Sequence, residues 1–147
     1  MNKYYIAYGS NLNVNQMKMR CPGAKVAGKG YINGYELLFK GSLTGAYLTI
    51  EKKKGGKVPV GIWEVNDTDE KALDRYEGYP NFYYKANVNL KIDDKIVNGF
   101  VYIMHEEREL GIPLSCYVDV CKEGYEAFSF DKRFLNNAIN RSISGHN

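Results

Sequence analysis

The chain has 147 residues, which suits one domain built around one hydrophobic core. Hydrophobic residues make up 44% of it and charged residues 25%, proportions that exclude a disordered chain. No apolar run approaches the ~20 residues of a membrane-spanning helix, so we expect a single domain over residues 1–147 and no membrane partner.

The net charge of +3 is unevenly distributed along the chain. Residues 1–58 contain ten Lys or Arg and two acidic residues, whereas residues 59–147 contain ten and fifteen. The densest basic run, KKKGGK at 52–57, is interpreted as a solvated hairpin tip, and no aromatic residues interleave with it. We therefore do not expect nucleic acid as a partner, and the basic half can instead attract an anionic substrate.

Cys21, Cys116 and Cys121 are an odd number of cysteines at spacings that fit no disulfide framework. They are expected to be reduced and buried as apolar side chains. The N-terminus leads directly into a strand-like segment, without a hydrophobic stretch followed by a small-residue cleavage site. Both features favour a cytoplasmic protein.

The N-terminal half of the chain is expected to be rich in strands. A strand over residues 4–8 ends at Gly9, and Asn13 then caps a short helix that stops at Pro22. The dipeptide at 33–34, Asn-Gly, is typical of a hairpin turn. Further strands are predicted over residues 24–31, 35–40, 47–51 and 58–65.

A longer helix is predicted to follow these strands. It opens at Asp67, and Glu70 three positions later completes a pattern like a capping box. The helix stops at Gly78, with a proline two residues beyond it.

The remaining segments complete the predicted fold. Residues 83–92 and 96–104 form a hairpin, two helices start near Ser115 and at Asp131, and residues 142–147 are a loose tail. Strands outnumber helices and are joined by short turns. This order predicts an α+β fold: a small, mixed, mostly antiparallel β-barrel with flanking helices.

Motifs for metals, cofactors and nucleophiles are not found. C-x-x-C, H-E-x-x-H and the glycine patterns of dinucleotide and phosphate loops are missing, so we expect no metal and no cofactor. Ser10 lacks the surroundings of a nucleophile elbow. His105 at a strand end is either a base or an ordinary surface residue.

The segment from Tyr8 to Leu12, with Gly9, Ser10 and Asn11 between them, is a first candidate for function. Glycine and asparagine tolerate unusual backbone angles, so successive N–H groups can point into one concavity and bind a carboxylate or an oxyanion. An ordinary strand-to-helix turn with an Asx cap is the structural alternative.

Glu77 is a second candidate. It lies four residues after Leu73 on the apolar stripe of its helix and at the helix C-terminus, where the macrodipole disfavours an anion. Tyr76, Tyr79 and Pro80 add surroundings of low polarity. These effects favour the neutral acid and tune the carboxyl for proton transfer near neutral pH, whereas a frayed helix end would leave it solvated.

These segments resemble the γ-glutamylcyclotransferase-like family, also called AIG2-like or BtrG-like. The resemblance covers residues 4 to about 126. The family's N-terminal Y-G-S-N-L loop is matched in full, and its strand-then-helix signature and later aromatic positions are matched in order. The matching segments are YGSNL at 8–12, GIWEV at 61–65, LDRYEG at 73–78, YY at 83–84 and PLSCY at 113–117.

The resemblance implies that Glu77 is the catalytic residue and that the loop from Tyr8 to Leu12 binds substrate. It also implies that Tyr83 or Tyr84, together with Tyr117, lines the pocket. The implied reaction is cyclisation of a small γ-glutamyl amide to 5-oxoproline with release of a free amine. Glu77 would move the proton, without a metal or a cofactor.

Several alternatives stay open at this point. The chain can be a cyclotransferase acting on a carrier-bound or biosynthetic γ-glutamyl group, or a small-molecule-binding barrel without catalysis. The amine that is released and the choice between monomer and homodimer also remain open.

Overall fold

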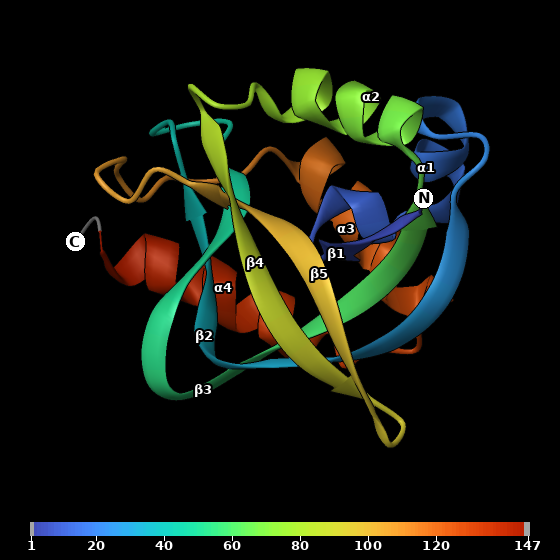
Figure 1. The fold of residues 1–147 in the computed structure, drawn as a ribbon. Helices are drawn as coiled ribbons and strands as arrows, with labels where there is room; N and C mark the ends of the chain where they lie inside the picture. The colour runs from blue at the N-terminus through green and yellow to red at the C-terminus, as the bar shows by residue number, and fades with distance from the viewer. Residues whose placement is uncertain (1, 146–147) are drawn as a thin grey trace.

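The computed structural model describes residues 2–145, which form one five-stranded sheet with four α-helices around it (Figure 1). The α+β class is therefore confirmed. None of the helices within residues 2–145 is both long enough and apolar enough to cross a bilayer. The strands are β1 (Lys3–Ala7), β2 (Lys25–Lys40), β3 (Tyr47–Val65), β4 (Tyr83–Ile92) and β5 (Lys95–Met104). The helices are α1 (Val14–Arg20), α2 (Asp67–Glu77), α3 (Ser115–Ala127) and α4 (Arg133–Ser144), and a short 3-10 turn covers Ser10–Leu12.

The sheet is mixed and mostly antiparallel, as expected, but it does not close into a barrel. Its strand order is β2-β3-β1-β5-β4, and β1 with β5 is the parallel pair. Among residues 2–145 no ladder joins the two edge strands, β2 and β4. They approach each other at Gly28, where a Cβ atom would lie 2.9 Å from the Ile92 side chain. The gap between β2 and β4 is therefore narrow but not bridged by strand pairing.

Two long strands replace the four short ones that the sequence predicts in the N-terminal half. Asn33-Gly34 does not form a hairpin, because Gly34 adopts its positive φ of 82° inside β2 at a break in the register. The basic segment 52–57 is likewise not a hairpin tip. Register pairs Tyr35 with Lys52 and Asn33 with Lys57, so the residues between them form an irregularity in β3 opposite that break.

The helix α2 begins at Asp67, as predicted, but its N-terminal cap is one residue earlier than the predicted pattern places it. Asn66, not Asp67, is the N-cap: its side chain accepts the N–H of Asp69, whose carboxylate accepts the N–H of Asn66 in return. The predicted partner, Glu70, points instead to two lysines. The helix ends where expected, because Gly78 has a left-handed conformation with a φ of 64°.

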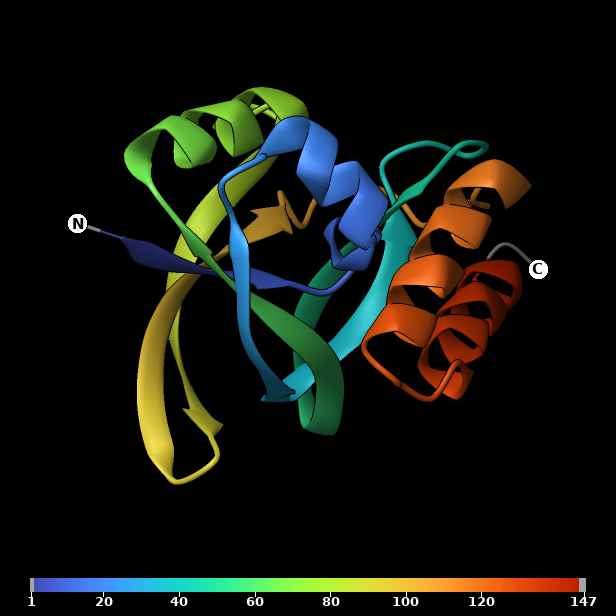
Figure 2. The ribbon, with the colours of Figure 1, turned by 90° about the vertical axis from the view of Figure 1, so that its right-hand side faces the viewer.

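The two C-terminal helices lie side by side against one side of the sheet, whereas α1 and α2 lie at one end of it (Figure 2). The helix α4 begins at Arg133 rather than at Asp131 and continues to Ser144, with Ser142 fully buried. The expected loose tail is therefore wrong for residues 142–144, because the helix still packs there, and residues 146–147 lie outside the described part. Cys21 and Cys121 are buried as expected, but Cys116 is exposed.

Candidate functional site

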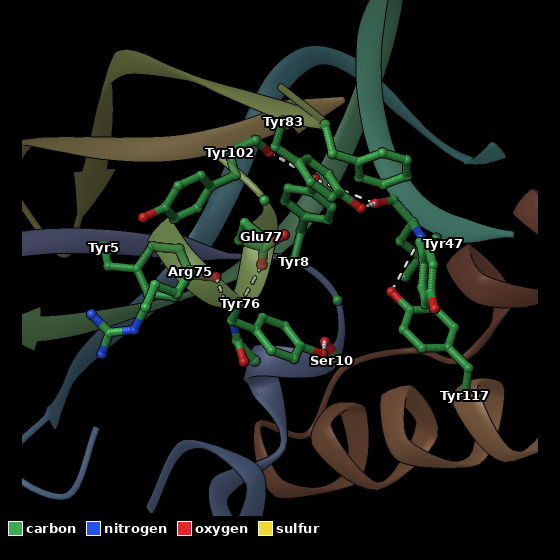
Figure 3. A pocket seen from close by; sticks show the side chains of 15 residues that line it. Tyr5, Tyr8, Ser10, Tyr47, Arg75, Tyr76, Glu77, Tyr83, Tyr102 and Tyr117 are labelled. Atoms are coloured by element: carbon green, nitrogen blue, oxygen red, sulfur yellow. Dashed lines mark hydrogen bonds between the residues drawn. The ribbon is translucent and has the colours of Figure 1, made fainter. Parts of the chain in front are cut away.

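A cavity of about 360 Å³ lies where the C-terminus of α2 faces the turn after β1 and the ends of β4 and β5 (Figure 3). Figure 3 shows the labelled side chains from these elements, from the start of β3 and from α3 arranged around this one hollow. Seven of the thirteen tyrosines line it, so more than half of the tyrosines of this chain gather at one cavity. The lining tyrosines are Tyr5, Tyr8, Tyr47, Tyr76, Tyr83, Tyr102 and Tyr117.

The turn after β1 lines this cavity with Gly9, Ser10 and Asn11. The N–H of Leu12 donates to the carbonyl of Gly9, and that of Asn13 donates to the carbonyl of Ser10, both at 3.0 Å. Within residues 2–145 no backbone carbonyl accepts the N–H of Ser10 or of Asn11. These two N–H groups follow Gly9, which lies so close to Leu48 that a Cβ atom there would be 3.3 Å from its side chain. The turn thus has free donors beside a cavity, which is the arrangement that binds an anion.

Asn11 connects this turn to Glu77. The backbone carbonyl of Asn11 accepts the indole N–H of Trp63 at 2.9 Å, which fixes the turn on β3. The amide Nδ2 donates to the hydroxyl of Tyr5 at 2.9 Å and lies 3.5 Å from Oε1 of Glu77. The catalytic candidate and the candidate loop, 66 positions apart between Asn11 and Glu77, therefore meet in one place.

Glu77 is part-buried at the end of α2, and no lysine or arginine forms an ion pair with it within residues 2–145. Burial raises the pKa of its carboxyl to about 7, and the nearby charge of Arg20 partly opposes that rise. The raised pKa expected from the sequence is therefore confirmed. A carboxyl with this pKa takes up and returns a proton near neutral pH.

Three of the tyrosines that line the cavity bond their hydroxyl groups to the backbone. Tyr83 donates to the carbonyl of Leu48 at 2.8 Å, Tyr8 donates to the carbonyl of Tyr102 at 2.7 Å, and Tyr117 accepts the N–H of Leu48 at 3.2 Å. Burial raises the pKa of Tyr8, Tyr83 and Tyr117 well above the ordinary value. These three groups stay neutral at physiological pH and add apolar rings, not charges, to the cavity walls.

Two of the residues expected in the pocket do not line it. Leu12 is fully buried and packs against α3, where a Cβ atom at Gly124 would lie 2.7 Å from it. Tyr84 points to the other face of β4, because neighbouring residues of a strand alternate, and its hydroxyl contacts Glu106. Tyr83 is therefore the member of the pair that faces the cavity.

The structure also adds residues that sequence reasoning did not assign to the pocket. Tyr5 comes from β1 and Tyr102 from β5, and Tyr47 and Phe82 lie at its other end. The sheet order, which places β5 beside β1, brings Tyr102 to the cavity, and no local signal in the sequence contains that order. Within residues 2–145 no group of three His, Cys, Asp or Glu side chains could hold a metal ion.

The chain is similar to known proteins both in sequence and in fold. A family model described as gamma-glutamyl cyclotransferase, AIG2-like, matches residues 5–119. A solved structure described as gamma-glutamyl cyclotransferase is 22% identical with a TM-score of 0.84, over 94% of this chain and 86% of that one. The protein loc79017 from Homo sapiens is 23% identical with a TM-score of 0.83, over 93% and 86%.

A third structure, YkqA from Bacillus subtilis, is 19% identical with a TM-score of 0.79, and the similarity covers 95% of this chain but 54% of that one. Comparison with curated protein sequences gave no match. At these identities the structural likeness shows the fold, whereas the family model spans most of the chain and includes both the turn after β1 and Glu77. The chain belongs to the gamma-glutamyl cyclotransferase, AIG2-like family.

Proposed function

We propose that this protein is a γ-glutamyl cyclotransferase that converts a small γ-glutamyl amide to 5-oxoproline and a free amine. One observation carries the proposal: the Glu77 carboxyl, with a pKa raised to about 7 by burial, shares a cavity with the unused N–H groups of Ser10 and Asn11. The first group moves protons and the second stabilises negative charge.

The reaction takes place within one substrate molecule. The α-ammonium group gives a proton to the Glu77 carboxylate, and the amine then attacks the γ-carbonyl carbon to close a five-membered ring. When the tetrahedral intermediate collapses, Glu77 gives its proton to the leaving nitrogen and the bond from that nitrogen to the γ-carbon breaks. The Glu77 carboxylate then takes the second proton from the ring nitrogen, which becomes the lactam N–H of 5-oxoproline, and passes this proton to the released amine. Because both reacting groups belong to one molecule, the site has mainly to hold them in a near-attack geometry.

Each element of the site has a defined part in this scheme. General acid–base catalysis of this kind contributes about 10²–10⁴ in rate. The N–H groups of Ser10 and Asn11 bind the substrate's carboxylate or the oxyanion of the intermediate, and loss of one oxyanion donor costs about 10²–10³ in kcat. A cavity of about 360 Å³ is at the small end of ligand sites, which favours a small-molecule substrate.

The test is release of 5-oxoproline from a panel of γ-glutamyl compounds: γ-glutamyl amino acids, a γ-glutamyl peptide, a γ-glutamyl amide of a lysine side chain, and a carrier-bound γ-glutamyl group. We expect wild-type protein to turn over at least one of them, with kcat/KM falling as the pH drops below about 7 because Glu77 becomes protonated. The compound that is turned over identifies the leaving amine.

Glu77→Gln should keep the fold and substrate binding but lose turnover by about 10²–10⁴. Glu107→Gln is the matched control, since Glu107 is exposed and lies outside the cavity, and it should behave as wild type. Unchanged turnover in Glu77→Gln would refute the role of Glu77. Binding of the panel without any 5-oxoproline from wild-type protein would instead indicate a non-catalytic binding domain.

A further inference from the structure

Arg20, the last residue of α1, contacts both halves of the site from behind the turn. Its Nη1 donates to Oδ1 of Asn11 at 2.7 Å, and its Nη2 donates to the Gln16 side chain at 2.6 Å. The plane of the guanidinium covers Tyr76, with Cζ 3.5 Å from the ring centroid. Tyr76 precedes Glu77 in α2, and its hydroxyl is 3.0 Å from Oγ of Ser10. One side chain thus holds the turn against the end of α2.

These contacts determine which way the Asn11 amide points. A guanidinium group only donates hydrogen bonds, so the atom of Asn11 that faces Arg20 must be the carbonyl oxygen Oδ1. The amino group Nδ2 is then directed to Tyr5 and to Oε1 of Glu77. A donor aimed at a carboxylate favours the ionised form, whereas a carbonyl oxygen in the same place would repel it.

We propose that Arg20 is a positioning residue that acts through Asn11, holding the amide with its N–H toward Glu77 so that the carboxylate is ready to accept a proton from the substrate. This inference rests on the proposed function of Glu77 as the base. Arg20 itself is separated from the reacting atoms by Asn11 and does not touch the substrate.

The charges around Glu77 agree with this role. The positive charge of Arg20 lowers the pKa of Glu77 against the larger effect of burial. The other titratable groups that face Glu77 are mostly phenols, and burial raises their pKa values so that they stay neutral. They are Tyr5 from β1, Tyr8 from the segment after it, Tyr83 from β4, Tyr102 from β5 and Tyr117 from α3. Two further groups come from α2 itself, the phenol of Tyr76 and the cation Arg75, and Arg75 also lines the cavity.

The first experiment measures Glu77 without any turnover. The side-chain carboxyl carbon of Glu77 is followed by NMR as a function of pH in ligand-free protein, with Glu77→Gln to assign the signal. In Arg20→Met, which keeps an unbranched apolar stem but loses the charge and the donors, we expect the titration midpoint to rise by about 1 pH unit. A folded Arg20→Met protein with the wild-type midpoint would overturn the proposal.

The second experiment separates charge from orientation. Arg20→Lys keeps the positive charge, but an ammonium group cannot donate in a plane to Asn11 and Gln16 while covering Tyr76. We expect a titration midpoint that rises by less than in Arg20→Met, because the charge is kept, together with a kcat reduced about tenfold and an unchanged KM. A wild-type kcat in Arg20→Lys would overturn the positioning role, and this variant also decides the matter if Arg20→Met does not fold.

Lys18→Met is the matched control, because Lys18 is an exposed cation of the same helix. It should change neither the titration nor turnover. The two proposals fail in different ways. Absence of 5-oxoproline from wild-type protein with the whole panel removes the proposed function. If Glu77→Gln loses turnover while both Arg20 variants keep the wild-type titration midpoint and kcat, only the proposed role of Arg20 is refuted.

Discussion

The two ends of α2 place the same side chain in opposite environments. Glu70 and Glu77 are seven residues apart, about two helical turns, so they share a face of the helix. Glu70 lies 2.8 Å from Lys3 and 2.8 Å from Lys85. Burial alone would raise the pKa of Glu70, but hydrogen bonds from these two lysines outweigh it and lower the pKa. Burial raises the pKa of Glu77 to about 7, and Arg20 opposes that rise only in part.

The difference shows that a shared face of a helix does not determine the pKa of a carboxyl group. The N-terminus of a helix stabilises an anion and the C-terminus destabilises it, which already separates the two sites. The groups that face each site complete the separation. Lysines from β4 and the N-terminal strand pair with Glu70, whereas tyrosines and an amide surround Glu77. The carboxylate near the start of α2 is ion-paired with lysines of the sheet, whereas the carboxyl at its end has a pKa raised to about 7.

The largest expected effect on turnover comes from the turn after β1, which faces the C-terminal end of α2. Gly9→Val adds atoms where a Cβ already lies 3.3 Å from Leu48 and 3.5 Å from the Tyr117 hydroxyl, so the turn must move away from the cavity. We expect kcat/KM for 5-oxoproline release to fall by about 10²–10³, the loss typical of a missing oxyanion donor. Gly23→Val is the control, because nothing lies within 4 Å of a Cβ there. Wild-type kinetics in Gly9→Val would show that the turn does not bind substrate.

The next effect is on stability, and its sign follows from the raised pKa of Glu77. The folded state holds the proton more tightly than the unfolded state, so the free energy of unfolding decreases as the pH rises from 4.5 to about 7. Since one pH unit corresponds to about 1.4 kcal/mol, the decrease amounts to at most about 3 kcal/mol. Glu77→Gln should therefore be more stable than wild type at pH 8 by up to about 3 kcal/mol, and equal to it near pH 4. Urea unfolding across this range measures the difference, and parallel curves for the two proteins would contradict the buried environment of Glu77.

The smallest effect is expected at the N-terminal end of α2. Glu70→Gln removes a carboxylate that pairs with Lys3 and Lys85, and partly exposed pairs contribute about 1 kcal/mol or less. Because the pKa of Glu70 is lowered on folding, this contribution is present at neutral pH and is lost as the pH falls through that lowered value. Urea unfolding at pH 7 and pH 3 should show the difference only at pH 7, with turnover close to wild type. If Glu70→Gln reduced turnover as much as Glu77→Gln does, the two ends of α2 would not differ in function as proposed.

Local signals account for what could be predicted from the sequence. The end of α2 at Gly78 and the hairpin of β4 with β5 depend on residues close together in the chain, and both are confirmed. The raised pKa of Glu77 also follows locally, because the helix C-terminus and the apolar stripe through Leu73 are visible in the sequence.

Features set by long-range pairing could not be predicted in the same way. Asn33-Gly34 has the residues of a hairpin turn, but the pairing of β2 with β3 continues on both sides of it. Gly34 adopts its positive φ at a break in the register inside β2. The contact of Arg20 with Asn11 depends on how α1 folds back on the turn, and Arg20 otherwise reads as a solvated residue at a helix end. Tyr102 enters the site only because β5 lies beside β1 in the sheet.

The narrow gap between β2 and β4 bears on whether the two edges of the sheet can pair with strands of other molecules. The edge of a sheet has free N–H and C=O groups that can recruit a strand of another molecule and start aggregation. Here the two edges face each other at Gly28 and Ile92, so each limits the access of foreign strands to the other. We expect a bulky side chain at Gly28 to push Ile92 away and to widen the gap between the two edges. The small size of this residue is therefore expected to limit strand pairing with other molecules, at a distance from the cavity.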